Sequence, residues 1–178
     1  MKKTGILLLM GLFLFQLFQG CNKTDDGTYT APITLYESIG GTWKLTSLKQ
    51  IDEIAKAGSA KPDEMLLTTK FSFNTFIIAL NVDSTENGIE PANYEVQGTA
   101  PQLFNASGYW ELDQAFPHTD NQATRIRLFS DAARTSLTDE LIVTAIPGAK
   151  AALQFNLTRL SEGVPYVSYQ YALKPVNQ

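Results

Sequence analysis

Short runs in which hydrophobic and polar residues alternate fill the chain from about residue 41 onward. A period of two residues is typical of β-strands with one buried face. The apolar positions that define these runs are Trp43 and Leu45; Phe71 and Phe73; Phe76, Ile78 and Leu80; Tyr94 and Val96; residues 109–112 and 126–129; Leu141, Val143 and Ala145; Leu153, Phe155 and Leu157; and Val167, Tyr169, Tyr171 and Leu173. The pattern predicts one all-β domain of about eight antiparallel strands.

Turn-forming residues separate the runs, and helical spacing is confined to two short segments. The turn signals are Asn87-Gly88, Pro101, Pro117, Pro147-Gly148 and Gly163. Residues 49–57, which end before Gly58, have helical spacing, and a short helical turn is expected at 35–39. Because closure into a barrel removes unpaired strand edges, we predict a lipocalin-like antiparallel barrel with one short helix rather than an open sheet.

The amino terminus has the features of an export signal. Lys2 and Lys3 precede an apolar run, residues 6–15, that is too short to cross a bilayer as a helix. The chain's single cysteine, Cys21, follows Gly20 and resembles the lipobox of bacterial lipoproteins, in which this cysteine is acylated. The predicted organisation is a signal peptide at 1–20, a lipidated flexible tether at 21–33 and a barrel domain at 34–178.

Acylation of Cys21 implies attachment to a membrane, because two or more acyl chains anchor a protein stably. The expected location is the outer membrane of a bacterial cell envelope. Lys23, Asp25 and Asp26 resemble the surface-export signal of Bacteroidetes lipoproteins, although Thr24 interrupts it. Whether the domain faces the periplasm or the cell exterior is left open, and an ordinary flexible tether is the alternative interpretation of this segment.

The composition limits the kinds of partner and metal site that the protein can have. The chain of 178 residues has 14 Lys and Arg against 18 Asp and Glu, a net charge of −4. No basic run is present, which argues against nucleic acid as a partner. With one Cys and one His, multi-thiolate and histidine-rich metal sites are excluded, and we expect neither a metal nor a cofactor.

Two Gly-x-Trp motifs occur in the predicted strands, Gly41-Thr42-Trp43 and Gly108-Tyr109-Trp110. The first resembles the signature of lipocalins, and with the lipobox it is similar to lipocalin-like lipoproteins of Bacteroidetes, most of which are domains of unknown function. The resemblance implies a structural role for Gly41, Trp43 and Arg159, with Arg159 stacked on the Trp43 ring. The alternative is that Arg159 only reaches solvent from a strand end.

The sequence shows no conventional set of catalytic residues. His118 lies in a turn-rich segment without a motif that presents a nucleophile, so we expect a solvated loop residue. Residues 83–88 partly imitate a calcium loop but place Tyr94 where the closing carboxylate belongs, which favours a hairpin turn. Asp52-Glu53 and Asp139-Glu140 are expected to be solvated surface acids. We therefore predict a protein that is not an enzyme.

The aromatic residues offer the best candidates for function. Those proposed to line a ligand site are Phe73, Trp110, Phe155, Tyr169 and Tyr171. An eight-stranded barrel is just wide enough for side chains to fill it, so a packed core is the competing interpretation. The family resemblance implies a protein that binds a small hydrophobic or amphipathic molecule. The alternative is a surface module with a packed interior that binds a glycan or a protein.

Overall fold

A computed structural model describes residues 32–86, 88–148 and 152–176 of the chain. Within it, Ile33–Gln178 forms one compact unit. The predicted signal peptide, Cys21 and nearly all of the predicted tether lie outside the described residues. No helix in the described part of the chain has both the length and the apolar character needed to cross a membrane.

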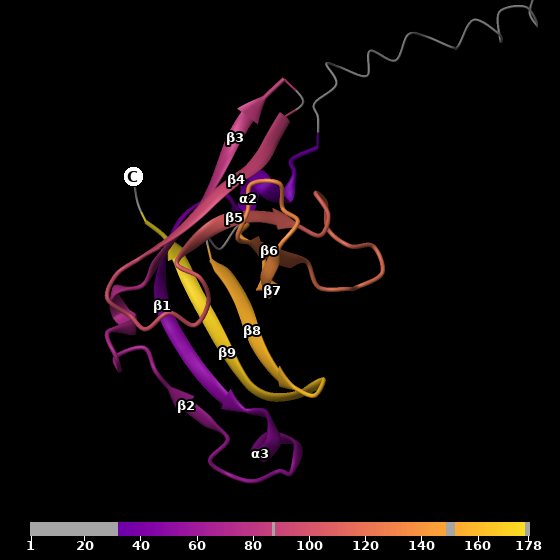
Figure 1. Cartoon of the computed structure of the whole chain (residues 1–178). Helices are drawn as coiled ribbons and strands as arrows, with labels where there is room; N and C mark the ends of the chain where they lie inside the picture. Colours follow the sequence, from indigo (N-terminus) through magenta and orange to yellow (C-terminus); the bar gives the residue numbers. More distant parts are fainter. Residues whose placement is uncertain (1–31, 87, 149–151, 177–178) are drawn as a thin grey trace, which may run out of the picture. The chain divides into compact units, whose positions relative to one another are not determined.

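The unit is a closed antiparallel barrel of eight strands with one additional strand on its side (Figure 1). The sheet order is β2-β1-β3-β4-β5-β6-β7-β8-β9, and pairing of β1 with β9 closes it. The strands are β1 (Gly41–Asp52), β2 (Glu64–Leu66), β3 (Ile77–Thr85), β4 (Gly88–Gln97), β5 (Ser107–Leu112), β6 (Arg125–Phe129), β7 (Leu137–Ala145), β8 (Leu153–Ser161) and β9 (Val164–Pro175). The predicted fold class is confirmed.

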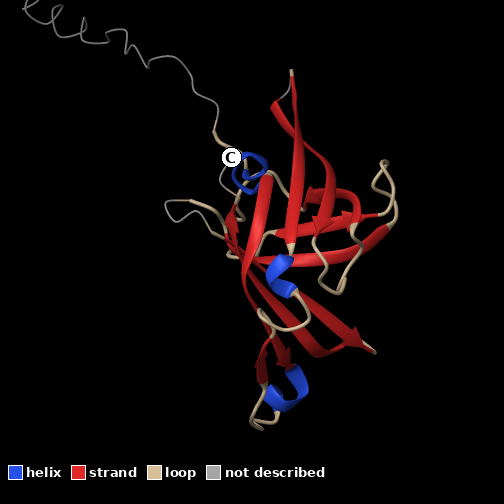
Figure 2. Cartoon of the chain, turned by 90° about the vertical axis from the view of Figure 1, so that its left-hand side faces the viewer, coloured by secondary structure: helices blue, strands red, loops and turns tan. Residues whose placement is uncertain are grey.

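Strands make up nearly all of the unit, and the short helical segments lie at separate places on it (Figure 2). These segments are α2 (Leu35–Ile39), α3 (Glu53–Ala57) and the 3₁₀ turn η2 (Phe73–Thr75). The helical turn expected at 35–39 is confirmed. The helix predicted at 49–57 is right only for its second half, because the first four of these residues continue β1 and pair with β9.

The helix α3 begins where β1 ends because Asp52 caps it. The Asp52 carboxylate accepts hydrogen bonds from the backbone N–H groups of Ile54 (3.1 Å) and Ala55 (2.9 Å), which would otherwise lack partners in a first helical turn. The predicted strand at Phe71 and Phe73 is wrong. Phe71 is exposed and Phe73 belongs to η2, where it is buried.

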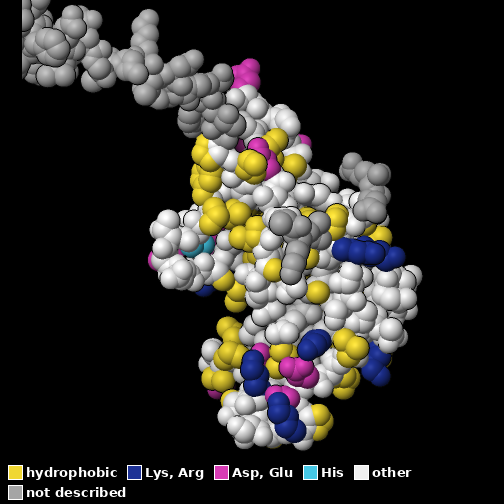
Figure 3. All heavy atoms as spheres, turned by 180° about the vertical axis from the view of Figure 1, so that it is seen from behind, with side chains coloured by type: hydrophobic (Ala, Val, Ile, Leu, Met, Phe, Trp, Pro, Cys, Tyr) yellow, Lys and Arg dark blue, Asp and Glu magenta, His cyan; other side chains and the backbone are white. Residues whose placement is uncertain are grey.

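Alternate positions of the barrel strands point inward and form a single hydrophobic core. Trp43 and Leu45 of β1, Leu80 of β3 and Leu173 of β9 are all buried there, as two-residue periodicity predicts. β1 leads directly into α3, which also contacts β9. Basic and acidic side chains gather together at the lower end of Figure 3. Pairs such as Lys49–Glu64, at 3.1 Å, account for this mixture of charges.

The helix α2 closes one end of the barrel. Its Leu35 and Ile39 are buried, and the Ile39 carbonyl accepts a hydrogen bond of 2.8 Å from the Trp43 indole. Tyr36 packs edge-on against Trp110, with ring centroids 5.6 Å apart, and its hydroxyl accepts the Leu112 N–H at 3.1 Å. Both Gly-x-Trp tryptophans are therefore anchored around the same short helix.

Candidate functional site

The five aromatic residues predicted to line a ligand site are mostly core residues. Phe73, Trp110, Phe155 and Tyr171 are buried, and only Tyr169 is partly exposed. The Trp110 indole donates a 2.7 Å hydrogen bond to the Asn81 carbonyl, so its polar edge is already satisfied. Each of the four buried members packs against protein rather than toward solvent.

Tyr171 is the centre of the aromatic packing. Its ring stacks on Phe155 at 4.8 Å and contacts Phe76 at 5.4 Å and Phe104 at 6.2 Å. Burial raises the pKa of its hydroxyl well above the usual value, so Tyr171 is neutral at physiological pH. Phe104 comes from the segment between β4 and β5, so a loop contributes to filling this part of the barrel.

Arg159 does not stack on Trp43 as predicted. Along β9, Trp43 pairs with Pro175 and Arg159 pairs with Val167, eight residues away. Eight strand residues span about 26 Å, so the two side chains lie far apart along the barrel wall. Parity with Phe155 and Leu157 correctly predicts the inward direction of Arg159, but the register places it near the opposite end from Trp43.

The partners of Arg159 are instead a carboxylate and a carbonyl. One guanidinium nitrogen lies 2.5 Å from Asp139 Oδ1, and another donates to the Leu103 carbonyl. The Asp139 side chain is only 9% exposed, so its expected position on the solvated surface is wrong. The Glu140 carboxylate next to it faces the other way and pairs with Arg125 at 2.8 Å.

This ion pair lies where β7 and β8 separate. The two strands pair from Leu141 opposite Leu157 up to Ala145 opposite Gln154, and no pairing continues toward Leu137. Beyond that point β7 stays with β6 whereas β8 stays with β9, and Figure 1 shows β8 and β9 running on away from β6 and β7. We call the resulting opening the strand gap.

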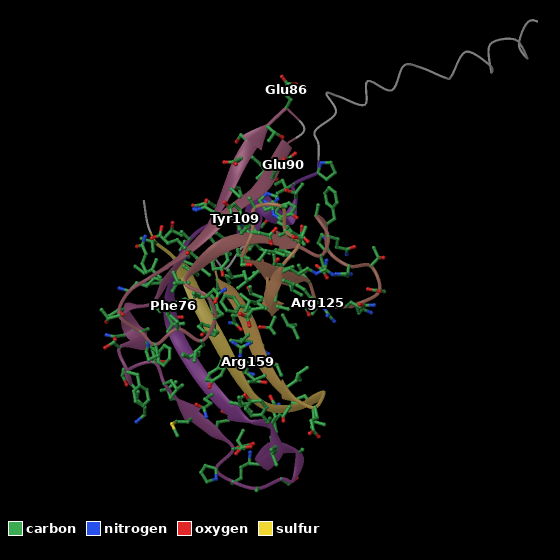
Figure 4. All side chains as sticks on the ribbon, viewed as in Figure 1. Phe76, Glu86, Glu90, Tyr109, Arg125 and Arg159 are labelled. Atoms are coloured by element: carbon green, nitrogen blue, oxygen red, sulfur yellow. The ribbon has the colours of Figure 1, made fainter. Side chains whose placement is uncertain are left out.

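The strand gap has the size and mixed character of a small-ligand site. Its volume is about 580 Å³, within the 300–1,000 Å³ or so that such sites occupy. Its apolar lining residues are Leu137, Ile142, Leu157, Leu160 and Pro165. Two of them, Leu137 and Leu160, are more than half exposed. Figure 4 labels Arg159 in this half of the unit, away from Glu86 at the tip of the β3–β4 hairpin.

A buried hydroxyl lies behind the wall of the gap. The Tyr94 side chain is fully buried, and no described group forms a hydrogen bond with its hydroxyl. Burial, with a further contribution from the Asp139 carboxylate, raises the pKa of Tyr94 to about 12, although the nearby Thr138 hydroxyl acts to lower it. Thr138, which also lies nearby and lines the gap, directs its own hydroxyl to the Leu128 carbonyl at 3.1 Å.

Gly108 makes room for the Tyr94 ring. The two residues are paired across β4 and β5, and a Cβ at position 108 would lie 2.9 Å from Tyr94 Cε1 and 2.3 Å from the Phe129 carbonyl oxygen. Any larger residue would therefore push these strands apart. The glycine of the second Gly-x-Trp motif is thus explained by the close approach of the Phe129 carbonyl and the Tyr94 ring.

The other acidic and histidine candidates have structural partners. His118 lies in a loop as predicted, but it is not solvated: its side chain is 16% exposed and its Nε2 lies 2.8 Å from Asp113. The segment at 83–88 lies at a hairpin turn, with β3 ending at Thr85 and β4 beginning at Gly88. Among the described residues no cluster of three or more His, Cys, Asp or Glu side chains could hold a metal ion.

The comparisons with known proteins identify a family without an assigned activity. The fold defines the protein as an antiparallel β-barrel protein with an opening in its wall. The chain belongs to the family described as "Domain of unknown function (DUF5004)", whose profile matches residues 17–174. No curated protein and no solved structure matches the chain.

Proposed function

We propose that this protein binds a small amphipathic molecule at the strand gap, without catalysing its conversion. The observation that carries the proposal is the combination of an apolar rim with the Arg159–Asp139 pair and the unpartnered Tyr94 hydroxyl. Unsatisfied buried polar groups are rare in folded proteins. One that lies beside an opening could form a hydrogen bond with a polar atom of a ligand. The apolar part of the ligand would contact Leu157 and Leu160.

The net charge of the polar cluster favours a ligand whose polar end is uncharged. Two acids, Asp139 and Glu140, line the gap with one base, Arg159, so a further negative charge there is not favoured. The Tyr94 hydroxyl is protonated at physiological pH and can donate a hydrogen bond. A carbonyl or hydroxyl oxygen could accept from Tyr94 without facing the Asp139 carboxylate as a second negative charge. A free carboxylate would meet that repulsion, which costs more in a poorly solvated site than in water.

Native mass spectrometry of the mature chain from its own host tests this proposal. The protein is released in a detergent of known mass, and a further mass excess that disappears on denaturation is expected. Leu160→Gln should reduce the occupied fraction. Val164→Gln is the matched control, because Val164 is similarly exposed on the neighbouring strand but does not line the gap. A bare polypeptide mass, or equal occupancy in both variants, would overturn the proposal.

We also propose that the protein is anchored in the bacterial envelope by acylation of Cys21. The support is the sequence context alone: a short apolar run, Gly20 and a single cysteine. Cys21→Ala should abolish incorporation of labelled palmitate, whereas Ser38→Ala should leave it unchanged. Labelling that persists in Cys21→Ala would remove the lipoprotein assignment without affecting the proposal for the strand gap.

A second candidate function is a surface module that recognises a glycan or a protein. The dense packing around Tyr171 favours it, because a filled interior leaves the outer surface as the place for recognition. The mass measurement separates the two candidates. A retained small molecule supports the strand gap, and its absence directs attention to the outside of the barrel.

A further inference from the structure

A second hollow lies on the outer face of β7, β8, β9 and β1. It has a volume of about 340 Å³, and side chains from all four strands line it. Of the lining residues, Tyr171 alone has its side chain in the core, in one row with Leu48 and Phe155. Alternation places the side chains of the other lining residues outside. This hollow shares no lining residue with the strand gap.

Two β-bulges flank the hollow at the same height. Ala145, Gln154, Ala172 and Ser47 are paired in one row across the four strands. The register shifts between Val143 and Ala145 on one side of this row and between Leu45 and Ser47 on the other. Bulges bend strands and redirect side chains, and they are over-represented beside functional sites.

Small residues in that row are flanked by longer polar ones in the next. Ala172 and Ser47 are the smallest side chains that line the hollow. Asn156, Gln170 and Lys49 form the neighbouring row, paired in that order across β8, β9 and β1. Short side chains bordered by amides on two adjacent strands create a depression in a barrel wall that would otherwise curve outward.

The lining is rich in hydrogen-bonding groups and nearly free of charge. The side-chain amides of Gln154, Asn156 and Gln170 form no hydrogen bond to protein within the described residues. Lys49 is the only charged side chain in the lining, and Glu64 already pairs with it at 3.1 Å. Each amide offers two donors and an acceptor, which suits a ligand that carries many hydroxyl groups.

We propose that this surface, the bulge hollow, binds a neutral oligosaccharide. Sugar hydroxyls both donate and accept, as the free amides do, and an uncharged sugar has no need of the ionic partner that the hollow lacks. The inference deepens the second candidate function and does not depend on the strand gap. The rings of the nearby aromatic residues Phe155 and Tyr171 point into the core, so hydrogen bonds rather than ring stacking would supply the affinity.

Binding of the mature chain to arrayed neutral and acidic oligosaccharides tests this proposal. At least one neutral oligosaccharide should bind. The double variant Asn156→Ala, Gln170→Ala should bind it about five- to 150-fold more weakly, the loss expected for two hydrogen bonds. Gln97→Ala is the matched control, an exposed amide on β4 outside the hollow. Leu160→Gln should have no effect, which keeps this outcome separate from that of the strand gap.

Three results would overturn the proposal. The first is no binding of any neutral oligosaccharide, and the second is stronger binding of acidic ones. The third is equal loss of binding in Gln97→Ala and in the double variant. All substituted positions are on the outer face, and an unchanged unfolding midpoint for each variant would show that the barrel itself is intact.

Discussion

The α2 end of the barrel and the strand gap differ in how the polar groups of their buried aromatic residues are bonded. Around α2, the Trp43 and Trp110 indoles donate to carbonyls and the Tyr36 hydroxyl accepts from Leu112. The small Thr34 hydroxyl at the start of α2 is buried without a hydrogen-bond partner among the described groups. At the gap, the Tyr94 hydroxyl has no hydrogen-bond partner among the described groups, and Asp139 depends on one partly exposed arginine. The hydrogen bonds around α2 stabilise the fold. At the gap, the Tyr94 hydroxyl is left able to form a hydrogen bond to a ligand, as a binding site requires.

Trp110→Ala should destabilise the barrel more than any substitution at the strand gap. Removing a fully buried tryptophan creates a cavity and costs about 3–5 kcal/mol. It would also leave the Asn81 carbonyl without its indole donor and Tyr36 without its aromatic partner. Chemical denaturation followed by tyrosine fluorescence measures the change.

Tyr109→Ala is the control for Trp110→Ala. Tyr109 is adjacent in β5 but faces the other side of the sheet and is partly exposed. Its loss should cost less than about 1.5 kcal/mol, as expected away from a packed core. Equal destabilisation by both variants would mean that the α2 end is not the rigid part of the barrel.

Arg159→Met should have the next largest effect, because it leaves the Asp139 carboxylate buried without its partner. Breaking a fully buried pair costs about 3–5 kcal/mol, but the Arg159 side chain is 34% exposed, so we expect about 1–3 kcal/mol. Adding Asp139→Leu should restore most of the loss. Arg127→Met, whose nearest acid is 3.8 Å away at the surface, should change stability by less than about 0.5 kcal/mol.

The double variant Arg159→Met, Asp139→Leu tests directly whether the strand gap differs from the α2 end. Met and Leu in place of the pair would make the gap wholly apolar, so stability should return while binding of the amphipathic ligand is lost. If stability and binding both return, the ion pair is structural and the two ends do not differ in the way proposed. Unfolding midpoints and the native mass of each variant, measured on the same preparation, decide between these results.

Asp113→Asn tests the electrostatics of the α2 end. Asp113 precedes Ala115, whose carbonyl accepts the first N–H of α2. Burial alone would raise the pKa of Asp113, but hydrogen bonds from the Arg125 N–H and from His118 together hold it below its ordinary value. The ionised form is therefore favoured in the folded state.

The sign of the pH dependence follows from that lowered pKa. The contribution of ionised Asp113 is fully present above the unfolded pKa of 3.8 and is lost as the pH falls through the lower folded value. We expect Asp113→Asn to be about 1–2 kcal/mol less stable than wild type at pH 7, with the difference shrinking below about pH 4. Asp120→Asn is the control, since Asp120 is 57% exposed, and it should change the stability at pH 7 by less than about 0.5 kcal/mol.

Much of the fold could be predicted from the sequence because strand alternation is local. Parity also places Arg159 on the inner face, and applied to Leu141 and Val143 it would place Asp139 there as well. The partners could not be predicted in this way. Whether Arg159 meets Trp43 or Asp139 depends on the register of β8 against β9 and on where β7 leaves β8, and neither is encoded in one strand.

The candidate site could not be predicted for a related reason. Large aromatic residues indicate a binding surface, yet Trp110, Phe155 and Tyr171 are packed against protein. The strand gap depends instead on Asp139 and Tyr94, one of which resembles a surface acid and the other an ordinary strand residue. Gly108 does give a signal, because a glycine within a strand indicates close approach of other groups, which in this barrel are the Phe129 carbonyl and the Tyr94 ring.

The smallest predicted effect compares two tyrosine hydroxyls, one at each end. Tyr36→Phe removes the acceptor of the Leu112 N–H and should cost about 1 kcal/mol. Tyr94→Phe removes a hydroxyl that no described group satisfies, so stability should be unchanged or slightly increased. Ligand occupancy should respond in the opposite order: it should be preserved in Tyr36→Phe and reduced about tenfold in Tyr94→Phe, the loss expected for one buried hydrogen bond. Paired unfolding curves and native mass spectra measure both quantities, and a clear loss of stability in Tyr94→Phe would show that this hydroxyl is satisfied in solution and belongs to the core rather than to a site.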